Sequence, residues 1–285
     1  MLLSVIIPAY NERHTLGTIL VAVARALPNV SKEIIIVDDC SIDGTREWLN
    51  ANFPNGQRSG STIDLDNNGN LVFKQLFGPS TVTIRPTYHE HNRGKGGGLQ
   101  TGFAAATGDI LVIQDADVEY DPNDWEQMYN LIAVRKVADV VFGSRFYGRP
   151  HRALYFHHYI GNRLISLVFN IIFNQTLTDI ETCYKMMTSR VARSLRLTAN
   201  DFGIEVEMSA EISRQRNLRI YELGISYFGR TYAEGKKINW KDGLMALWYV
   251  FRFRFRSGHH FKRESVCSAF DCSHQTREGG PIIDE

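Results

Sequence analysis

The sequence lacks the features that mark membrane-spanning, secreted and nucleic-acid-binding proteins. Its 285 residues carry 32 Lys and Arg against 31 Asp and Glu, so a formal net charge of +1 supplies no field that would draw the whole protein onto nucleic acid. The four cysteines, Cys40, Cys183, Cys267 and Cys272, include no close CxxC pair, which argues against a disulfide scaffold and a zinc site. No run reaches the ~20 consecutive apolar residues of a spanning helix, and the N-terminus lacks the basic region of a signal peptide. We therefore expect a cytoplasmic protein with reduced thiols and no nucleic-acid partner.

What the sequence does contain is a globular composition with alternating strand and helix patterns. Hydrophobic residues make up 44% and charged residues 22% of the chain, which is enough apolar material for a large core. Short β-branched runs predict strands at 2–7, 33–37, 110–113 and 139–142. Apolar residues at helical spacing predict helices over 16–27 and 122–135 between them. This alternation indicates an α/β fold with a mostly parallel, doubly wound sheet and helices on both faces.

Three further segments differ from this core in composition. Residues 54–81 combine Gly, Asn and Pro with short apolar pairs and are predicted to form a hairpin-like surface insertion. Residues 159–173 and 244–256 are strongly apolar helical patterns, too short to span a bilayer but suited either to an interface with lipid or to core packing. The polar residues toward the C-terminus predict a flexible tail. We therefore expect one domain over 1–250 and a tail over 251–285.

The acidic run QDADVEYD at 114–121 follows directly after a predicted strand. Asp115 and Asp117 are one residue apart at the strand end, where ligands of parallel sheets bind. Their hard oxygens suit Mg²⁺ or Mn²⁺ held together with phosphate groups, and Glu119 could complete the set. The alternative interpretation is a solvated acidic turn before the helix that Pro122 opens.

Two other strand ends carry polar residues. In VDDCSIDGT at 37–45, Asp38 or Asp39 could accept hydrogen bonds from a base or a ribose, while Ser41 or Asp43 caps the helix that follows. After the first strand, a ring at Tyr10 could face a base and a carboxylate at Glu12 could bind ribose hydroxyls. As generic loop residues these would be unremarkable.

The glycine-rich run HNRGKGGG at 91–98 precedes a predicted helix over 99–106. Its glycines would let backbone N–H groups approach an anion, and Arg93 and Lys95 would add positive charge. The GxxxxGK[ST] spacing of a P-loop is absent. We interpret the run as a flexible loop facing a phosphate, with an ordinary turn as the alternative.

Taken in order, these segments resemble the family 2 glycosyltransferases with a GT-A fold, and most closely the branch of dolichol-phosphate mannose synthases and polyprenyl-phosphate glucosyltransferases. The resemblance spans roughly residues 3–250. It rests on SVIIPAYNE at 4–12, IIIVDDCSIDGT at 34–45, NRGKGGGLQTGFAAATGD at 92–109, QDADVEYDP at 114–122, VFGSRF at 141–146, TDIETCYKMM at 178–187 and GRTYAEGKKI at 229–238.

The resemblance implies roles for individual residues. The positions that hold the nucleoside of a nucleotide sugar are matched by Pro8, Ala9, Tyr10, Glu12, Val37 and Asp39. Asp115, Ala116 and Asp117 match the family's DAD motif, in which Asp117 and the residue two further on, here Glu119, hold the metal, with Asp115 beside them. Arg230 and Lys236 fall on the pattern R-x-Y-G-E-S-K that closes on the diphosphate, although Ala233 and Gly235 replace its Gly and Ser.

The implied reaction is inverting displacement at the sugar C1, so a metal ion and cationic side chains must stabilise the departing nucleoside diphosphate. Asp117, Glu119, Arg230 and Lys236 meet that need, and Arg145 of the GSR motif matches a residue that binds the acceptor phosphate. The second acceptor arginine of the mannose synthases has no clear counterpart: Tyr159 stands in its place, near Arg152 and Arg163.

The nature of the acceptor decides whether a base is needed. A polyprenyl phosphate is already ionised and needs none, whereas a sugar hydroxyl requires one, for which Asp179, Glu205 and Glu207 are the candidates. We expect a hexosyltransferase that uses GDP-mannose or UDP-glucose, a Mg²⁺ or Mn²⁺ ion and a polyprenyl phosphate, with peripheral contact at the cytosolic membrane face. The alternatives are a hydroxyl acceptor with the same donor, and a noncatalytic subunit that binds nucleotide sugars.

Overall fold

In a computed structural model of the chain, the described residues are 1–74, 80–148, 150, 152, 155–230 and 240–255. Residues 1–255 form one unit. The strands are β1 Leu2–Ala9, β2 Ser31–Asp38, β3 Arg58–Gly60, β4 Thr62–Leu65, β5 Leu71–Lys74, β6 Val82–Tyr88, β7 Ile110–Ile113, β8 Val140–Ser144, β9 Lys185–Thr188 and β10 Ile220–Gly224. The helices are α1 Leu16–Arg25, α2 Thr45–Asn52, α3 Gly94–Ala105, α4 Trp125–Tyr129, α5 Phe156–Phe173, α6 Ser189–Ser194, α7 Gly203–Ser213 and α8 Trp240–Phe255.

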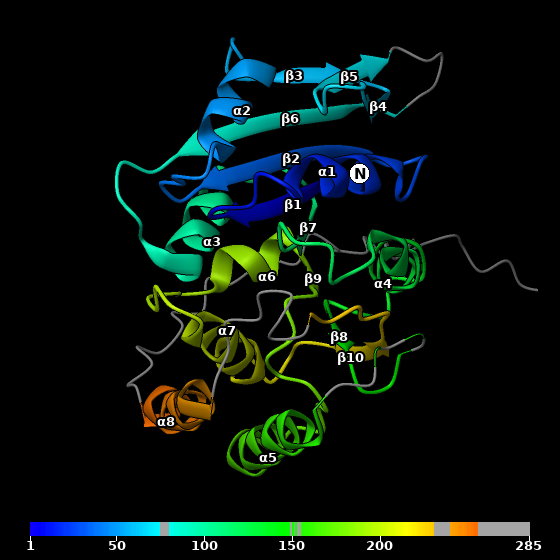
Figure 1. Cartoon of the computed structure of the whole chain (residues 1–285). Coiled ribbons are helices and arrows are strands. Elements are labelled where there is room, and N and C mark those ends of the chain that lie inside the picture. The colour runs from blue at the N-terminus through cyan, green and yellow to red at the C-terminus, as the bar shows by residue number, and fades with distance from the viewer. Residues whose placement is uncertain (75–79, 149, 151, 153–154, 231–239, 256–285) are drawn as a thin grey trace, which may run out of the picture. The chain divides into compact units, whose positions relative to one another are not determined.

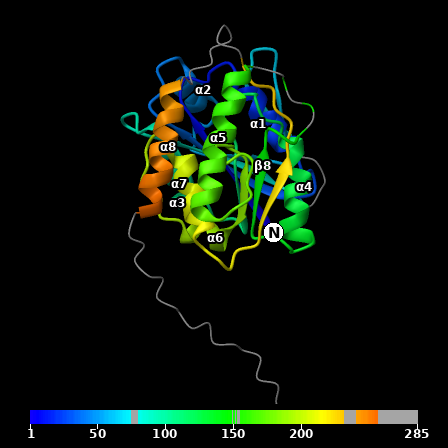
Figure 2. The same cartoon turned by 90° about the horizontal axis from the view of Figure 1, so that it is seen from below.

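Eight of these strands form one sheet in the order β10-β8-β9-β7-β1-β2-β6-β3 (Figure 1). Neighbouring strands are parallel except where β9 inserts antiparallel between β7 and β8 and where β3 adds antiparallel to β6. The central strands are apolar along nearly their whole length because helices cover both faces of the sheet. Figure 2 shows α1 and α4 on one side of the molecule and α3, α7 and α8 on the other.

The parallel arrangement brings the carboxyl ends of β1, β2, β7 and β8 to one edge of the sheet. The loops that follow these ends contain Tyr10, Asp39, the acidic run and Arg145. The predicted α/β fold with a mostly parallel sheet is therefore confirmed, and its topology explains why segments far apart in the sequence meet.

Several predicted boundaries differ from the observed ones. The helix predicted over 122–135 is a succession of a 3₁₀ turn at Pro122–Asp124, α4, and a π-helical turn at Asn130–Val134. Within the predicted insertion 54–81, β4 and β5 form a hairpin, but β3 joins the main sheet and Ile63 and Leu71 are buried in the core. Helix α8 continues to Phe255, past the predicted domain end at 250, and the rest of the predicted tail lies outside the described residues.

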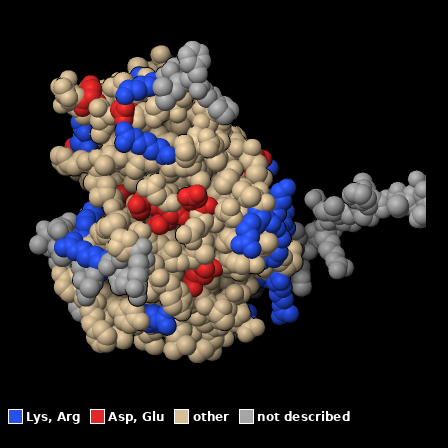
Figure 3. Space-filling model, turned by 90° about the vertical axis from the view of Figure 1, so that its right-hand side faces the viewer, with Lys and Arg blue, Asp and Glu red and all other residues tan. Residues whose placement is uncertain are grey.

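Among the described residues, no helix combines the length and the hydropathy that crossing a membrane requires. The two described cysteines, Cys40 and Cys183, are free thiols. Figure 3 shows the face on the right-hand side of Figure 1, where acidic side chains gather near the middle and basic ones toward the edges. The described part of this face thus carries both signs of charge, in keeping with the near-neutral composition.

Candidate active site

The acidic loop after β7 carries three carboxylates with different partners. Asp115 lies 2.8 Å from the Lys95 Nζ atom at the start of α3. Asp117 and Glu119 share one cation: the Arg230 guanidinium contacts Asp117 Oδ2 and Glu119 Oε1 at 2.7 Å each. The Arg230 backbone N–H also donates to Glu119 at 3.1 Å. Residues more than one hundred positions apart therefore meet at one point, which brings together three of the candidate residues from the sequence motifs: Asp117, Glu119 and Arg230.

The electrostatics of this loop favour an additional cation. Burial, together with the negative charges of Asp115 and Glu119, raises the pKa of Asp117 to about 7 despite the nearby Arg230. Among the residues that the structure describes, no three His, Cys, Asp or Glu side chains converge as the ligands of one metal would. Asp117 and Glu119 are nevertheless hard oxygen donors of the kind that Mg²⁺ and Mn²⁺ prefer. These two carboxylates therefore fit a divalent cation. In the structure, Arg230 supplies the positive charge that faces them.

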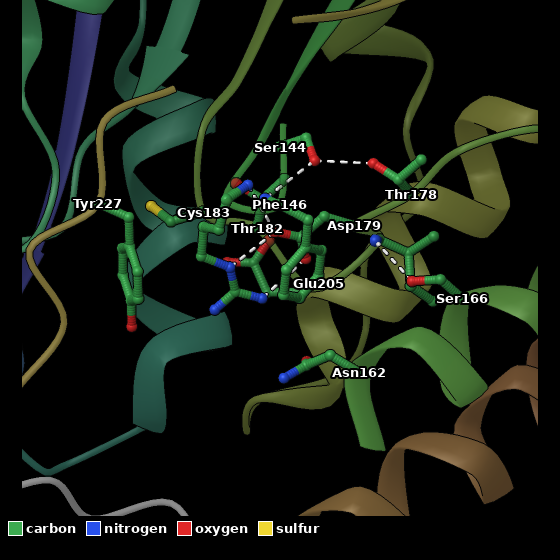
Figure 4. A network of polar contacts seen from close by, with 12 residues as sticks. Ser144, Phe146, Asn162, Ser166, Thr178, Asp179, Thr182, Cys183, Glu205 and Tyr227 are labelled. Carbon is green, nitrogen blue, oxygen red and sulfur yellow. Dashed lines mark hydrogen bonds and ion pairs between the residues drawn. The ribbon is translucent and has the colours of Figure 1, made fainter. Parts of the chain in front are cut away.

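Arg145 follows β8 and is held by a buried carboxylate. Its Nε and Nη2 atoms each donate to Asp179 at 2.7 Å, and its backbone N–H donates to the same carboxylate at 3.1 Å. The Tyr227 ring lies 5.5 Å from the guanidinium carbon. Figure 4 shows Asp179 in the middle of this network, Tyr227 at its left and Asn162 of α5 beneath it. A bidentate pair of this geometry fixes the guanidinium plane.

The turn that carries Asp179 is fixed by a further carboxylate. Glu222 of β10 accepts hydrogen bonds from the Thr178 N–H at 2.8 Å, the Thr178 hydroxyl at 2.9 Å and the Asp179 N–H at 3.2 Å. The Thr178 hydroxyl also lies 2.7 Å from the hydroxyl of Ser144, next to Arg145 (Figure 4). At the place of the missing second arginine, the Tyr159 ring packs edge-on against Phe146 at 5.3 Å.

The three candidates for a general base are all engaged in other contacts. Asp179 binds Arg145, as above. Although burial raises the pKa of Glu205, the charges of Lys185 and Lys95 outweigh it and hold that pKa below its usual value. Glu207 is fully buried and accepts from the Thr198 N–H, the Thr198 hydroxyl and the Ala199 N–H at 2.7 to 2.8 Å. These carboxylates hold the structure together and are poorly placed to take a proton.

The residues predicted to hold a nucleoside surround the ends of β1 and β2. Asp39 Oδ1 is 2.7 Å from His89 Nδ1 and accepts from the Arg93 N–H at 2.8 Å. Glu12 accepts from the Thr15 hydroxyl at 2.7 Å, and its charge acts on Arg230, which connects this side to the acidic loop. Tyr10 is 39% exposed, so its ring is accessible to a base. Pro8 is half-buried, and Ala9 and Val37 of this predicted set are buried, as is Ala116 of the DAD motif.

The glycine-rich run serves packing, which corrects its interpretation as a flexible loop. Helix α3 begins at Gly94, five residues before the predicted start at 99. Gly94 has φ +73°, and a Cβ there would lie 2.3 Å from the Asn200 carbonyl oxygen. A Cβ on Gly96 would lie 2.0 Å from the Ala199 carbonyl oxygen, and the Gly96 N–H donates to Asn200 at 2.8 Å. These glycines allow the segment before α7 to approach α3.

Two further residues near the site, Glu181 and Tyr227, were not predicted from the sequence motifs. Glu181 follows Asp179 by two residues, and burial raises its pKa to about 7, an effect that the charges of Arg145 and Lys185 oppose. Tyr227 donates its hydroxyl to Glu119 at 3.0 Å. Glu181 lies in the motif TDIETCYKMM and could have been found from the sequence. Tyr227 lies in a segment without a charge pattern, so no sequence signal pointed to it. Lys236, predicted to contact the diphosphate, lies outside the described residues.

Comparisons with known proteins identify the family and the fold. The profile described as Glycosyl transferase family 2 matches residues 4–69 and 74–196. An undecaprenyl-phosphate mannosyltransferase of Micrococcus luteus is 27% identical over 241 residues, which cover 81% of this chain and 85% of the relative. A dolichyl-phosphate beta-glucosyltransferase of Dictyostelium discoideum is 26% identical over 280 residues, covering 89% of this chain and 74% of the relative.

A similar fold occurs in a crystal structure of glucosyl-3-phosphoglycerate synthase from Mycobacterium tuberculosis in complex with Mn²⁺, UDP and phosphoglyceric acid. The TM-score is 0.61 at 15% identity, and the match covers 90% of this chain and 80% of that one. This likeness supports the GT-A-like α/β fold. With most of its length matched by the family profile and the acidic loop at the carboxyl edge of the sheet, the chain belongs to glycosyl transferase family 2 and is a glycosyltransferase.

Proposed function

We propose that this glycosyltransferase moves a hexose from GDP-mannose or UDP-glucose to a polyprenyl phosphate, with inversion at the sugar C1 and with a divalent cation. The observation that carries the proposal is the Arg145 guanidinium, fixed by Asp179 beside the acidic loop. A preorganised arginine suits a phosphate. Two relatives that match most of the chain are named as polyprenyl-phosphate sugar transferases, which supports the same acceptor.

On the donor side, the chain provides charges for the diphosphate. Asp117 and Glu119 would hold the Mg²⁺ or Mn²⁺ ion, which when bound supplies positive charge to the leaving group. Arg230 is the cation nearest to these carboxylates. We infer that its guanidinium would contact the diphosphate when Asp117 and Glu119 hold the metal. Tyr10, Glu12 and Asp39 would bind the nucleoside.

On the acceptor side, the proposed reaction needs no base, because the phosphate oxygen is already ionised near neutral pH. This agrees with the engagement of Asp179, Glu205 and Glu207 in buried hydrogen bonds and ion pairs. Arg145 would bind the phosphate and hold its attacking oxygen in place. Positioning and charge compensation, rather than proton transfer, would then account for most of the rate enhancement.

Peripheral membrane contact is part of this proposal, because a polyprenyl phosphate resides in a bilayer. Helices α5 and α8 pack against each other (Figures 1 and 2). On α5 the apolar side chains that are exposed recur at helical spacing: Ile160, Leu164, Leu167 and Ile171. On α8 the corresponding residues are Leu244, Met245, Trp248, Phe251 and Phe255. The α8 arginines Arg252 and Arg254 would attract anionic lipid at the cytosolic face.

The test is transfer of labelled hexose from GDP-mannose and UDP-glucose to undecaprenyl or dolichyl phosphate with Mn²⁺ or Mg²⁺. We expect a labelled product in the organic phase, abolished by Asp117→Ala in a variant whose melting temperature matches that of the unliganded wild type. Absence of product with every polyprenyl phosphate would refute the acceptor, and full turnover by Asp117→Ala would refute the metal role.

A hydroxyl acceptor remains the second candidate, because Glu181 has the pKa of about 7 that suits a general base. If Glu181 acts as a base, Glu181→Gln should reduce transfer to sugar hydroxyls by ~100-fold or more. With a phosphate acceptor, the same variant should retain turnover and instead lose the rise in acceptor KM above pH 7, since the ionised Glu181 would repel a phosphate dianion. The two outcomes distinguish the candidates.

A further inference from the structure

Tyr227 occupies the segment between the acidic loop and the loop that leads from β8 to α5. It forms an antiparallel β-bridge with Tyr120 of the acidic loop. On its other side, the Tyr227 N–H donates to the Pro150 carbonyl at 3.0 Å, and the Arg152 N–H donates to the Tyr227 carbonyl at 2.9 Å. Next to it, the Phe228 N–H donates to the Glu119 carbonyl of the acidic loop at 2.8 Å. The backbone at Tyr227 and Phe228 therefore ties two functional loops together.

The Tyr227 side chain contacts both functional groups of the site. Its hydroxyl donates to Glu119 Oε2 at 3.0 Å, while its ring lies 5.5 Å from the Arg145 guanidinium carbon. The Tyr120 ring packs on it at a centroid distance of 5.5 Å and limits its movement. In Figure 4 the Tyr227 ring faces the network that contains Asp179.

We propose that Tyr227 is a positioning residue shared by the donor and acceptor sites: its hydroxyl orients Glu119 for the divalent cation, and its ring supports Arg145 for the acceptor phosphate. This inference rests on the proposed function, which assigns Glu119 to the metal and Arg145 to the acceptor. The hydroxyl acts mainly on Glu119 and the ring acts on Arg145, so that two substitutions can separate the two effects.

Tyr227→Phe removes the hydroxyl and keeps the ring. Loss of a hydrogen bond to a charged carboxylate should weaken Mn²⁺ binding by ~10-fold, while the KM for polyprenyl phosphate stays within about twofold of the wild-type value. Tyr227→Leu removes the ring as well. It should weaken Mn²⁺ binding equally and in addition raise the acceptor KM by roughly 3- to 10-fold, because the cation–π contact with Arg145 is lost.

The experiment measures Mn²⁺ binding to each folded protein by calorimetry, and the acceptor KM at saturating Mn²⁺ and donor. Tyr221→Phe is the matched control, because Tyr221 lies on β10 and is 42% exposed; it should change neither quantity. A merely structural role would lower the melting temperature and the active fraction without this division between metal affinity and acceptor KM.

The proposal is overturned if Tyr227→Phe binds Mn²⁺ as the wild type does, or if Tyr227→Leu and Tyr227→Phe have the same acceptor KM. Failure of the proposed function would look different: the wild type would transfer to no polyprenyl phosphate. The metal half of the inference would still be decided by calorimetry, and the ring half by the binding of farnesyl phosphate to wild type and Tyr227→Leu in the absence of turnover.

Discussion

Replacing Asp179 by Asn should destabilise the protein and disable the acceptor site together. Asp179 is 1% exposed and accepts three hydrogen bonds from Arg145. An Asn side chain offers one oxygen, and its NH₂ group would face a donor of Arg145 while the guanidinium charge stays buried. Removing one partner of a buried ion pair costs about 3–5 kcal/mol. For a domain of this size, the loss corresponds to a fall in melting temperature on the order of 10 °C.

The assay is urea unfolding of the wild type, Asp179→Asn, Arg145→Met and the double variant. Because the double variant leaves neither charge unpaired, it should recover at least ~2 kcal/mol relative to the sum of the single losses. It should still transfer no hexose to polyprenyl phosphate, since Arg145 is gone. If the two losses add to within about 0.5 kcal/mol, Arg145 and Asp179 do not act as a pair, and the reasoning fails.

Three further predictions concern charge and packing elsewhere. Arg230→Gln should increase the affinity for Mn²⁺ severalfold in the absence of donor, because Asp117 and Glu119 lose a competing cation. The same variant should lower transfer by ~100-fold. An unchanged Mn²⁺ affinity in calorimetry would contradict this. Burial lowers the pKa of Lys32 from 10.5 to about 8, so between pH 8 and 10.5 the unfolded chain binds one more proton than the folded chain. The free energy of unfolding should therefore rise by about 3 kcal/mol from pH 8 to 10.5. Urea unfolding at several pH values should show this rise in the wild type and not in Lys32→Met. Gly96→Ala should lower the melting temperature by several degrees, because its Cβ would meet the Ala199 carbonyl at 2.0 Å, whereas Gly161→Ala on α5, with open space around it, should match or exceed the wild type.

The sequence allowed the sheet core and the edge of the site to be predicted because local patterns encode them. The strand at 110–113 has the same bounds as β7, since four β-branched or aliphatic residues end at a polar run. Parallel pairing then places Asp115 and Asp39 at the same edge as Tyr10. The order of the motifs indicated the family, which the profile over 4–69 and 74–196 confirms.

The parts that could not be predicted depend on contacts between distant segments. Strand β9 is only four residues long, and it joins the sheet antiparallel because the gap between β7 and β8 accepts it. The glycine run resembles an anion-binding loop until the carbonyls of Ala199 and Asn200 are placed beside it. The contact of Arg230 with Asp117 spans 113 positions, and the role of Tyr227 follows only from what lies on its two sides.

The charge balance of the site supports the proposed metal, although the whole chain is nearly neutral. Carboxyl groups outnumber cations in the described network, which contains Asp115, Asp117, Glu119, Asp179, Glu181 and Glu205 against Lys95, Arg145, Lys185 and Arg230. The raised pKa values of Asp117 and Glu181, about 7 each, report this excess together with burial. A nucleoside diphosphate would bring more negative charge to a site where every cation already faces a carboxylate. Asp117 and Glu119 would hold a divalent cation whose positive charge would leave Arg230 free to face the diphosphate, so donor binding and metal binding should strengthen each other.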